Sequence, residues 1–303
     1  MGSERARAAA FASLFLPAVL LSGGRAAALA NDIQIPALGN PNVDPTAVQR
    51  FRMLSDELGI TLAGTTLEPA GTVGSDGFDI GLELTVAFIN AATMINGQPY
   101  WSTASPASAP LIIPAFHVRK GLPYSFEIGG KVMTITDSGM YAGQAEVKWG
   151  MLEGFRYLPD VSARAYLTQL FSQQDLNLTT GSADFTVGKS FGIEGLVALA
   201  PYLGWCLTGI EADTNAFWIG GLTEQQYQQA PLADQVRYAP TSANRLGWND
   251  NLYDRFYLGL VMRSHIVSLN VEYDYSRPSA WSGASFPIHP GISTVGLRLA
   301  LTL

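Results

Sequence analysis

Residues that could carry out nucleophilic or metal-assisted chemistry are scarce in this sequence. Its 303 residues include three histidines and one cysteine, Cys206. A single cysteine excludes an internal disulfide and a cysteine-based zinc site, and no stretch has the spacing of a metal-binding or phosphate-binding loop. Ser264 and His265 are adjacent, but neighbouring strand residues point to opposite faces, which disfavours a nucleophile and base of the kind a lipase uses. The sequence therefore predicts no cofactor, no metal site and no enzyme.

The charged residues are more informative, because they alternate with apolar ones. Between residues 78 and 88 the large apolar side chains occupy the even positions, and Asp79 and Glu83 lie among the small residues of the odd positions. A period of two is typical of a β-strand whose two faces meet different surroundings. The ten stretches that show this period are residues 78–88, 110–119, 122–136, 141–149, 161–168, 183–188, 195–208, 255–263, 267–275 and 294–303.

Within these stretches nearly all charges share the parity opposite to that of the large apolar residues. This separation indicates one apolar face and one enclosed polar face. His117 is expected on the polar face as well. The side chains that we expect to line the enclosed space are Glu83, Glu127, Glu146, Lys148, Arg164, Arg255, Arg263, Glu272 and Arg298.

The composition agrees with a surface that does not mostly face water. Hydrophobic residues make up 48% of the chain and charged residues only 14%, whereas average soluble domains carry roughly 25% charged residues. The formal net charge is −7, which disfavours binding to nucleic acid because that affinity comes largely from clustered Lys and Arg.

Residues 78–303 resemble a Gram-negative outer-membrane β-barrel. Most of the stretches approach the roughly 9 to 11 residues that a tilted transmembrane strand needs, and the connections alternate between short and long. Such barrels commonly end on an aromatic residue that the assembly machinery reads, and this chain has Leu303 there. The resemblance implies an all-β fold, a single antiparallel up-and-down barrel of about ten strands, with twelve as the next count. It also implies location in the bacterial outer membrane, contact with its lipid, and contact with the barrel assembly machinery during biogenesis.

Two segments precede the expected barrel. Residues 1–30 have the plan of a secretory signal peptide: Arg5 and Arg7, an apolar stretch, and an A-x-A site before Asn31. Residues 31–77 are expected to form a periplasmic segment. Its short helix begins after Asp44-Pro45 and stops at Gly59. Three positions remain open for this segment: packed at the barrel mouth, inserted into the lumen as a plug, or in contact with another protein.

The function is expected to depend on whether the lumen of the barrel is open or closed to solutes. The leading interpretation is a porin-like channel or transport protein whose inward charges select a small polar solute. A second is a closed structural barrel that meets a partner through the long outer loop 209–251. A third is an outer-membrane hydrolase, in which His289 with Asp250 or Asp254 would form an acid-plus-histidine site similar to that of the ten-stranded omptin proteases. The network of inward charges fits both an open and a closed interior.

Overall fold

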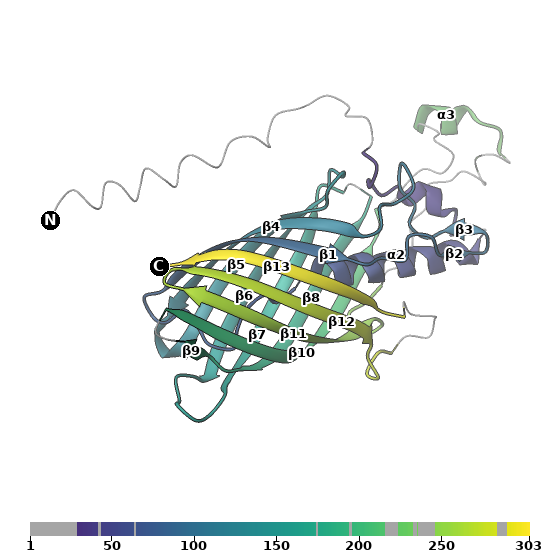
Figure 1. Ribbon diagram of the computed structural model, residues 1–303. Helices are drawn as coiled ribbons and strands as arrows, with labels where there is room; N and C mark the ends of the chain where they lie inside the picture. The colour runs from purple at the N-terminus through teal and green to yellow at the C-terminus, as the bar shows by residue number, and fades with distance from the viewer. Residues whose placement is uncertain are drawn as a thin grey trace, which may run out of the picture.

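The computed structural model describes residues 29–303 except 42–43, 64, 174, 194–195, 216–223, 233–234, 236–245 and 284–289. The expected signal peptide therefore lies almost wholly outside the described residues. The described part is one β-barrel with an N-terminal segment at and inside one end (Figure 1). Among the described residues, no helix combines the length and apolar character that crossing a membrane requires.

Ten long strands form the wall in the part of the chain that the structure describes. They are β1 (Phe78–Ala87), β4 (Leu111–Leu122), β5 (Phe126–Thr134), β6 (Tyr141–Leu152), β7 (Asp160–Phe171), β8 (Asn177–Gly188), β10 (Val197–Asp213), β11 (Leu252–Ser264), β12 (Val267–Pro278) and β13 (Ile292–Thr302). Each pairs antiparallel with the next along the chain, and β13 pairs back with β1, so the wall has no open edge. The ten-stranded all-β barrel expected from the sequence is confirmed.

Short elements complete the described structure. They are η1 (Ile35–Leu38), α2 (Pro45–Ala63), the β2–β3 pair (Met94–Ile95 and Gln98–Pro99), η2 (Pro123–Ser125), β9 (Phe191–Ile193) and α3 (Glu224–Gln229). β10 extends to Asp213 and β11 starts at Leu252, so the long connection expected at 209–251 is residues 214–251.

The alternation of side chains decides which face of the wall is apolar. In β1, Leu82 is 64% exposed on the outer face, whereas the neighbouring Glu83 is 4% exposed on the inner face. The same parity continues through the strands paired with β1, where Leu299 and Phe116 lie beside Leu82. A bilayer offers no hydrogen bonds to backbone groups, so an apolar outer face is compatible with lipid only because the wall is closed.

The two ends of the barrel differ in their connections. At one end lie the short connections 123–125, 153–159, 189–196 and 265–266, together with the start of β1 and the end of β13. There the Phe78 amide donates to the Leu303 carbonyl over 2.9 Å. At the other end lie connections 88–110, 135–140, 172–176, 214–251 and 279–291, of which 88–110, 214–251 and 279–291 are the long ones. We call these the turn end and the loop end.

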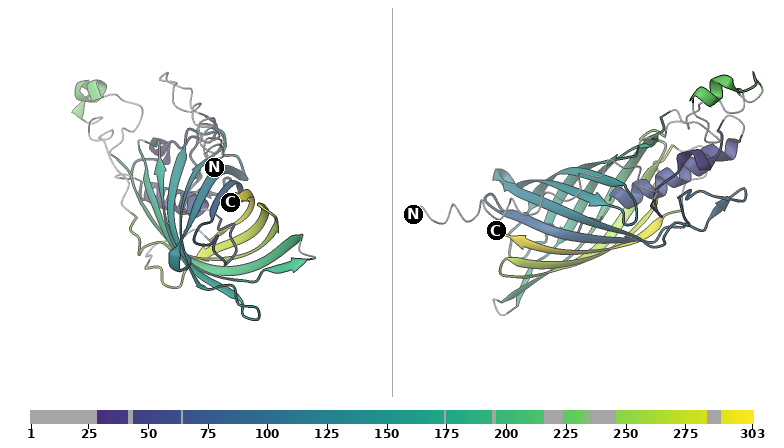
Figure 2. Two further views of the ribbon diagram at one scale, coloured as in Figure 1. Left: turned by 90° about the vertical axis from the view of Figure 1, so that its left-hand side faces the viewer. Right: turned by 90° about the horizontal axis from the view of Figure 1, so that it is seen from above.

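Helix α2 lies at the loop end (Figure 2). Its Leu54 and Leu58 are fully buried, and its Glu57 accepts hydrogen bonds from the Asn90 amide and the Tyr100 hydroxyl in connection 88–110. The helix expected from the sequence is confirmed. The buried apolar face of α2 needs the cover that the long connections supply.

The helix also runs further than the sequence predicts. Gly59 was expected to end it, yet α2 continues to Ala63. A Cβ added at Gly59 would lie 2.8 Å from Cγ2 of Ile210 in β10. The glycine therefore permits a close approach between helix and wall, and this tertiary contact outweighs its weak helix propensity.

Residues 65–77 continue from α2 through the interior to the turn end, where β1 begins. Thr65, Leu67 and Glu68 are at most 2% exposed. The amides of Thr66 and Leu67 donate to Glu272 of β12, over 2.5 and 2.8 Å. Of the three positions left open for the N-terminal segment, these contacts match a plug. We call residues 65–77 the plug segment.

Candidate functional site

The enclosed interior holds the side chains that the sequence singles out. Eight of the nine are buried on the inner face: Glu83, Glu127, Glu146, Lys148, Arg164, Arg255, Glu272 and Arg298. Arg263, two residues from the turn 265–266, is half-buried. The placement follows from strand parity, because successive residues of a strand alternate between the two faces.

A continuous ion-pair network crosses the interior between β1 and β8. His117 of β4 bridges two carboxylates, with Nδ1 at 2.8 Å from Glu83 and Nε2 at 3.0 Å from Glu146. Arg164 of β7 then lies 3.3 Å from Glu146 and 2.8 Å from Asp184 of β8. Buried charges are tolerated only when they are paired and hydrogen-bonded. This network therefore fills and rigidifies the interior.

A second group of pairs lies between β13, β1, β4 and β5. Arg119 contacts Asp79 over 3.0 Å and Glu127 over 2.7 Å. Arg298 is paired with Asp79 and lies 3.2 Å from Glu83. Because Glu83 also contacts His117, this group joins the first network.

Glu68 of the plug segment lies where these groups meet, and sequence reasoning missed it. Its carboxylate lies 3.0 Å from Arg119, 3.4 Å from Lys148 and 3.8 Å from both Arg164 and His117. No periodicity assigns Glu68 a direction. The one available signal is that it is the only charged residue between Glu57 and Asp76.

Lys148 and the strand carboxylates hold the rest of the plug segment. Lys148 Nζ donates to the carbonyls of Pro69, over 2.7 Å, and Gly71, over 3.0 Å. The Val73 amide donates to Glu127 over 2.9 Å. Backbone groups of the plug segment are thus satisfied by wall side chains, not by an added strand.

Glu68, His117 and Glu146 also satisfy the geometric condition for a metal centre. Their candidate ligand atoms all lie within 4.8 Å of one another, and the three form the one such group among the described residues. However, Arg119, Lys148 and Arg164 lie against the Glu68 carboxylate and already compensate its charge. A divalent cation would have to displace these basic groups or be repelled by them. The arrangement therefore fits a set of ion pairs that binds the plug segment better than it fits a metal site.

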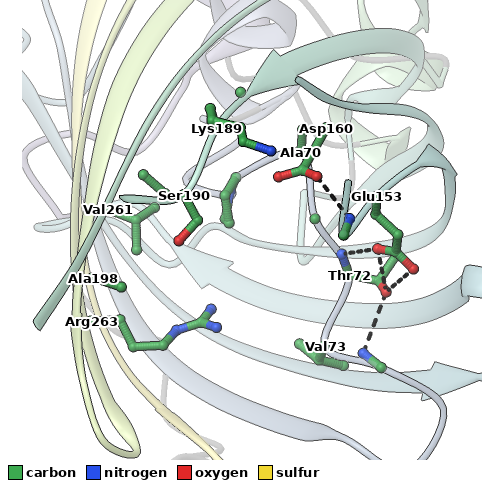
Figure 3. Close-up of a pocket in the computed structure, with 16 residues that line it drawn as sticks. Ala70, Thr72, Val73, Glu153, Asp160, Lys189, Ser190, Ala198, Val261 and Arg263 are labelled. Carbon is green, nitrogen blue, oxygen red and sulfur yellow. Dashed lines mark hydrogen bonds between the residues drawn. The ribbon is translucent and has the colours of Figure 1, made fainter. Parts of the chain in front are cut away.

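The turn end holds a cavity of about 480 Å³ between the plug segment and the inner face of β8, β10 and β11 (Figure 3). Glu153 borders it and accepts hydrogen bonds from the amide and hydroxyl of Thr72, both over 2.9 Å. Burial alone would raise the pKa of Glu153, but hydrogen bonds from Ser125 and Thr72 outweigh it and hold the pKa below the usual range. The carboxylate is therefore ionised at neutral pH and fastens the end of the plug segment.

A closed antiparallel wall, apolar outside and charged inside, defines a transmembrane β-barrel of the bacterial outer membrane. The interior is occupied by the plug segment and by the networks that surround it. This class of fold serves several functions, so the class does not determine the activity.

Comparison with known proteins adds the following. The chain matches no protein-family profile and no curated protein. Solved structures that it resembles include the attachment invasion locus protein Ail of Yersinia pestis, at 11% identity and a TM-score of 0.28, covering 76% of this chain and 99% of Ail. For the N-terminal β-barrel domain of Pseudomonas aeruginosa OprF, the sequence identity is 9% and the TM-score is 0.30, with 76% of this chain and 99% of that domain covered. For the Escherichia coli outer membrane protease OmpT, the sequence identity is 8% and the TM-score is 0.36, with 75% of this chain and 96% of OmpT covered. At these identities and scores the likeness does not extend to a function or a site.

Proposed function

We propose that this protein is a gated passage for small polar solutes across the outer membrane, and that the plug segment closes it in the present conformation. The proposal rests on the contacts between Lys148 and the plug segment. Its ammonium contacts Glu68, Pro69 and Gly71 at once. A segment held by side chains can leave without breaking the strand pairing of the wall.

The polarity of the interior supports a polar solute. Displacement of the plug segment would free groups that now bind it, including Lys148, Lys131 and Glu272. Such groups along a narrow path select by charge and hydrogen bonding, as charged rings in pores do. The plugged state is compatible with transport, because large outer-membrane transporters also have a plugged lumen.

Planar-bilayer recordings of the refolded protein test the proposal. We expect the wild type to be closed most of the time, and Lys148→Gln to open at least ten times more often, because the substitution removes a charge-assisted anchor of the plug segment. Lys189→Gln is the matched control. The ammonium of Lys189 donates to the Phe155 and Leu158 carbonyls of a turn and not to the plug segment. If neither Lys148→Gln nor deletion of residues 31–77 gives current at any voltage, the passage is rejected.

A closed barrel that acts through its loop end is the second candidate. The favouring observation is that the network from Glu83 through His117 and Glu146 to Arg164 crosses the interior without using the plug segment. A barrel of this size is nearly filled by its own side chains. In that case connection 214–251 would meet the partner, and deletion of residues 31–77 would leave the barrel silent in the bilayer assay.

The orientation in the membrane belongs to the same proposal. Short turns face the periplasm in bacterial outer-membrane barrels, so we infer that α2 and the long connections face outward. Membrane lipid surrounds the wall, and the barrel assembly machinery and a small polar solute remain the proposed partners. The proposal includes no enzymatic activity. His289 lies outside the described residues, and Asp254 accepts a hydrogen bond from the Trp205 indole over 3.1 Å.

A further inference from the structure

The cavity at the turn end is lined by both apolar and polar residues. Its volume is about 480 Å³, within the 300–1,000 Å³ typical of small-molecule sites. One side is the inner face of β10 and β11, with Ala198, Val261 and Arg263. The opposite side is the plug segment around Thr72 (Figure 3). Because the lining wall residues face inward, the space is reached from the turn end and not from the lipid around the barrel.

Arg263 differs from the other basic residues of the inner wall. In the part of the chain that the structure describes, an acidic partner or a hydrogen bond is present for each of Arg119, Lys131, Lys148, Arg164, Arg255 and Arg298. Arg263 has neither among the described residues. Its buried Nε lacks an acceptor, as do those of Arg119, Arg255 and Arg298, so the missing ion pair is what distinguishes Arg263. A partly buried guanidinium without an acceptor is costly, so the site is built for a negatively charged group that comes from outside.

The two carboxylates whose charges act on Arg263, Asp79 and Glu127, are already engaged. Asp79 pairs with Arg119 and Arg298, and Glu127 pairs with Arg119. Among the described residues, Arg263 forms an ion pair with neither of these carboxylates.

The other charged groups of the cavity are held by the wall and the plug segment. Lys189 donates to two turn carbonyls, Glu153 binds Thr72, and Asp160 accepts a hydrogen bond from the Gly154 amide over 3.0 Å. None of these contacts reaches Arg263. The Ser190 hydroxyl also lines the cavity and is a further donor for a bound solute (Figure 3).

We propose that the turn-end cavity binds a small soluble oxyanion, a phosphate or a carboxylate, through the guanidinium of Arg263. The planar fork of a guanidinium matches two oxygens of such a group, and Ser190 supplies a second donor. The inference names a solute class for the proposed passage and rests on the proposed function only in that respect. Binding itself requires no opening of the barrel.

Isothermal titration of the full mature chain tests the site. The protein is refolded in dodecyl maltoside without phosphate, and inorganic phosphate and succinate are titrated separately. We expect saturable binding of at least one of them, and Arg263→Gln is expected to weaken it by at least about tenfold, the loss of a charge-assisted hydrogen bond. Arg263→Lys keeps the positive charge but lacks the planar guanidinium, so its affinity should lie between those of the wild type and Arg263→Gln. Heat-modifiable migration on a gel verifies that each variant is folded.

Arg277→Gln is the matched control. The guanidinium of Arg277 lies 5.2 Å from the Phe256 ring centroid, and Arg277 does not line the cavity. Equal affinity of wild type and Arg263→Gln, or no binding by the wild type, overturns the proposal. Binding of dihexanoyl-phosphatidylglycerol without binding of phosphate or succinate overturns the assignment to a soluble anion. Each result is obtained on the closed barrel, so it is independent of the conductance experiment.

Discussion

Neutralising Glu68 by Glu68→Gln is the sharpest perturbation of the plug segment. The carboxylate has four basic neighbours within 3.8 Å, the nearest being Arg119 at 3.0 Å. Removing one partner of a buried ion pair costs about 3–5 kcal/mol, because the remaining charge is left uncompensated. The surrounding carboxylates Glu83, Glu127 and Glu146 stay in place, so we take the lower end, about 3 kcal/mol. At 1.4 kcal/mol for each tenfold change, the equilibrium between the bound and released plug segment should shift by roughly 150-fold.

Hydrogen exchange measures this equilibrium whether or not the released state conducts. The amides of Thr66 and Leu67 donate to Glu272 and are protected only while the plug segment is bound. We expect their protection to fall by roughly 150-fold in Glu68→Gln. Glu153→Gln serves as the control. Its carboxylate holds Thr72 from a more exposed site, so the loss should stay below about tenfold.

Unchanged protection in a folded Glu68→Gln protein would refute the reasoning. It would mean that the four basic neighbours are satisfied without the plug carboxylate and that the segment is held by other contacts. Bilayer recordings of the same variant separate the two candidate functions. A large loss of protection with no current would leave the plug contacts standing and favour the closed barrel.

Three further predictions concern the wall and the helix. Gly59→Val should lower the free energy of unfolding by about 1–3 kcal/mol in urea titrations, because a Cβ would lie 2.8 Å from Ile210. Leu82→Arg should cost roughly 2–4 kcal/mol in refolding into liposomes, since it puts a charge on the lipid face. The hydroxyl of Thr46 and the guanidinium of Arg50 hold the pKa of Asp44 below 3.8. This contribution to stability is therefore present above that pH and lost as the pH falls through the lowered value, as amide exchange in the first turn of α2 should show.

Each of these three predictions has a control variant. Gly71→Ala is the control for Gly59→Val. It should leave the free energy of unfolding unchanged, because nothing lies within 4 Å of a Cβ at Gly71. Leu82→Ala separates lost apolar contact from the cost of the charge. Asp44→Asn should remove the acid dependence at the start of α2. An equal pH response in Asp44→Asn, or an equal loss from Gly71→Ala and Gly59→Val, would contradict the corresponding prediction.

The wall was predictable because its pattern is local. Alternation with a period of two assigns Leu82 and Glu83 to opposite faces before any partner strand is known, and the structure keeps this assignment. The ten strands and the apolar outer face follow from the same repetition. Boundaries were less accurate. β8 begins at Asn177 and not at 183. Its first residues pair with the end of β10, where Asn177 lies opposite Asp213, although apolar and polar side chains do not alternate clearly there.

The N-terminal segment shows where local rules fail. Gly59 has the propensity of a helix terminator, yet α2 continues because the glycine lies flush against Ile210, 151 positions further along the chain by their numbers. Glu68 lies in a stretch without periodicity, so no face could be assigned to it. Its four basic partners come from three different strands.

The sequence by itself determined the class of fold, the closed wall and the side of that wall on which each strand charge lies, since all three depend on residue type and spacing along a strand. Only the tertiary structure decided that the interior is occupied, that Glu68 joins the two networks, and that Arg263 alone among the described inner-wall cations lacks a partner. Those outcomes depend on which inward groups meet across the lumen. That is set by strand register and barrel closure, which join residues far apart in the chain.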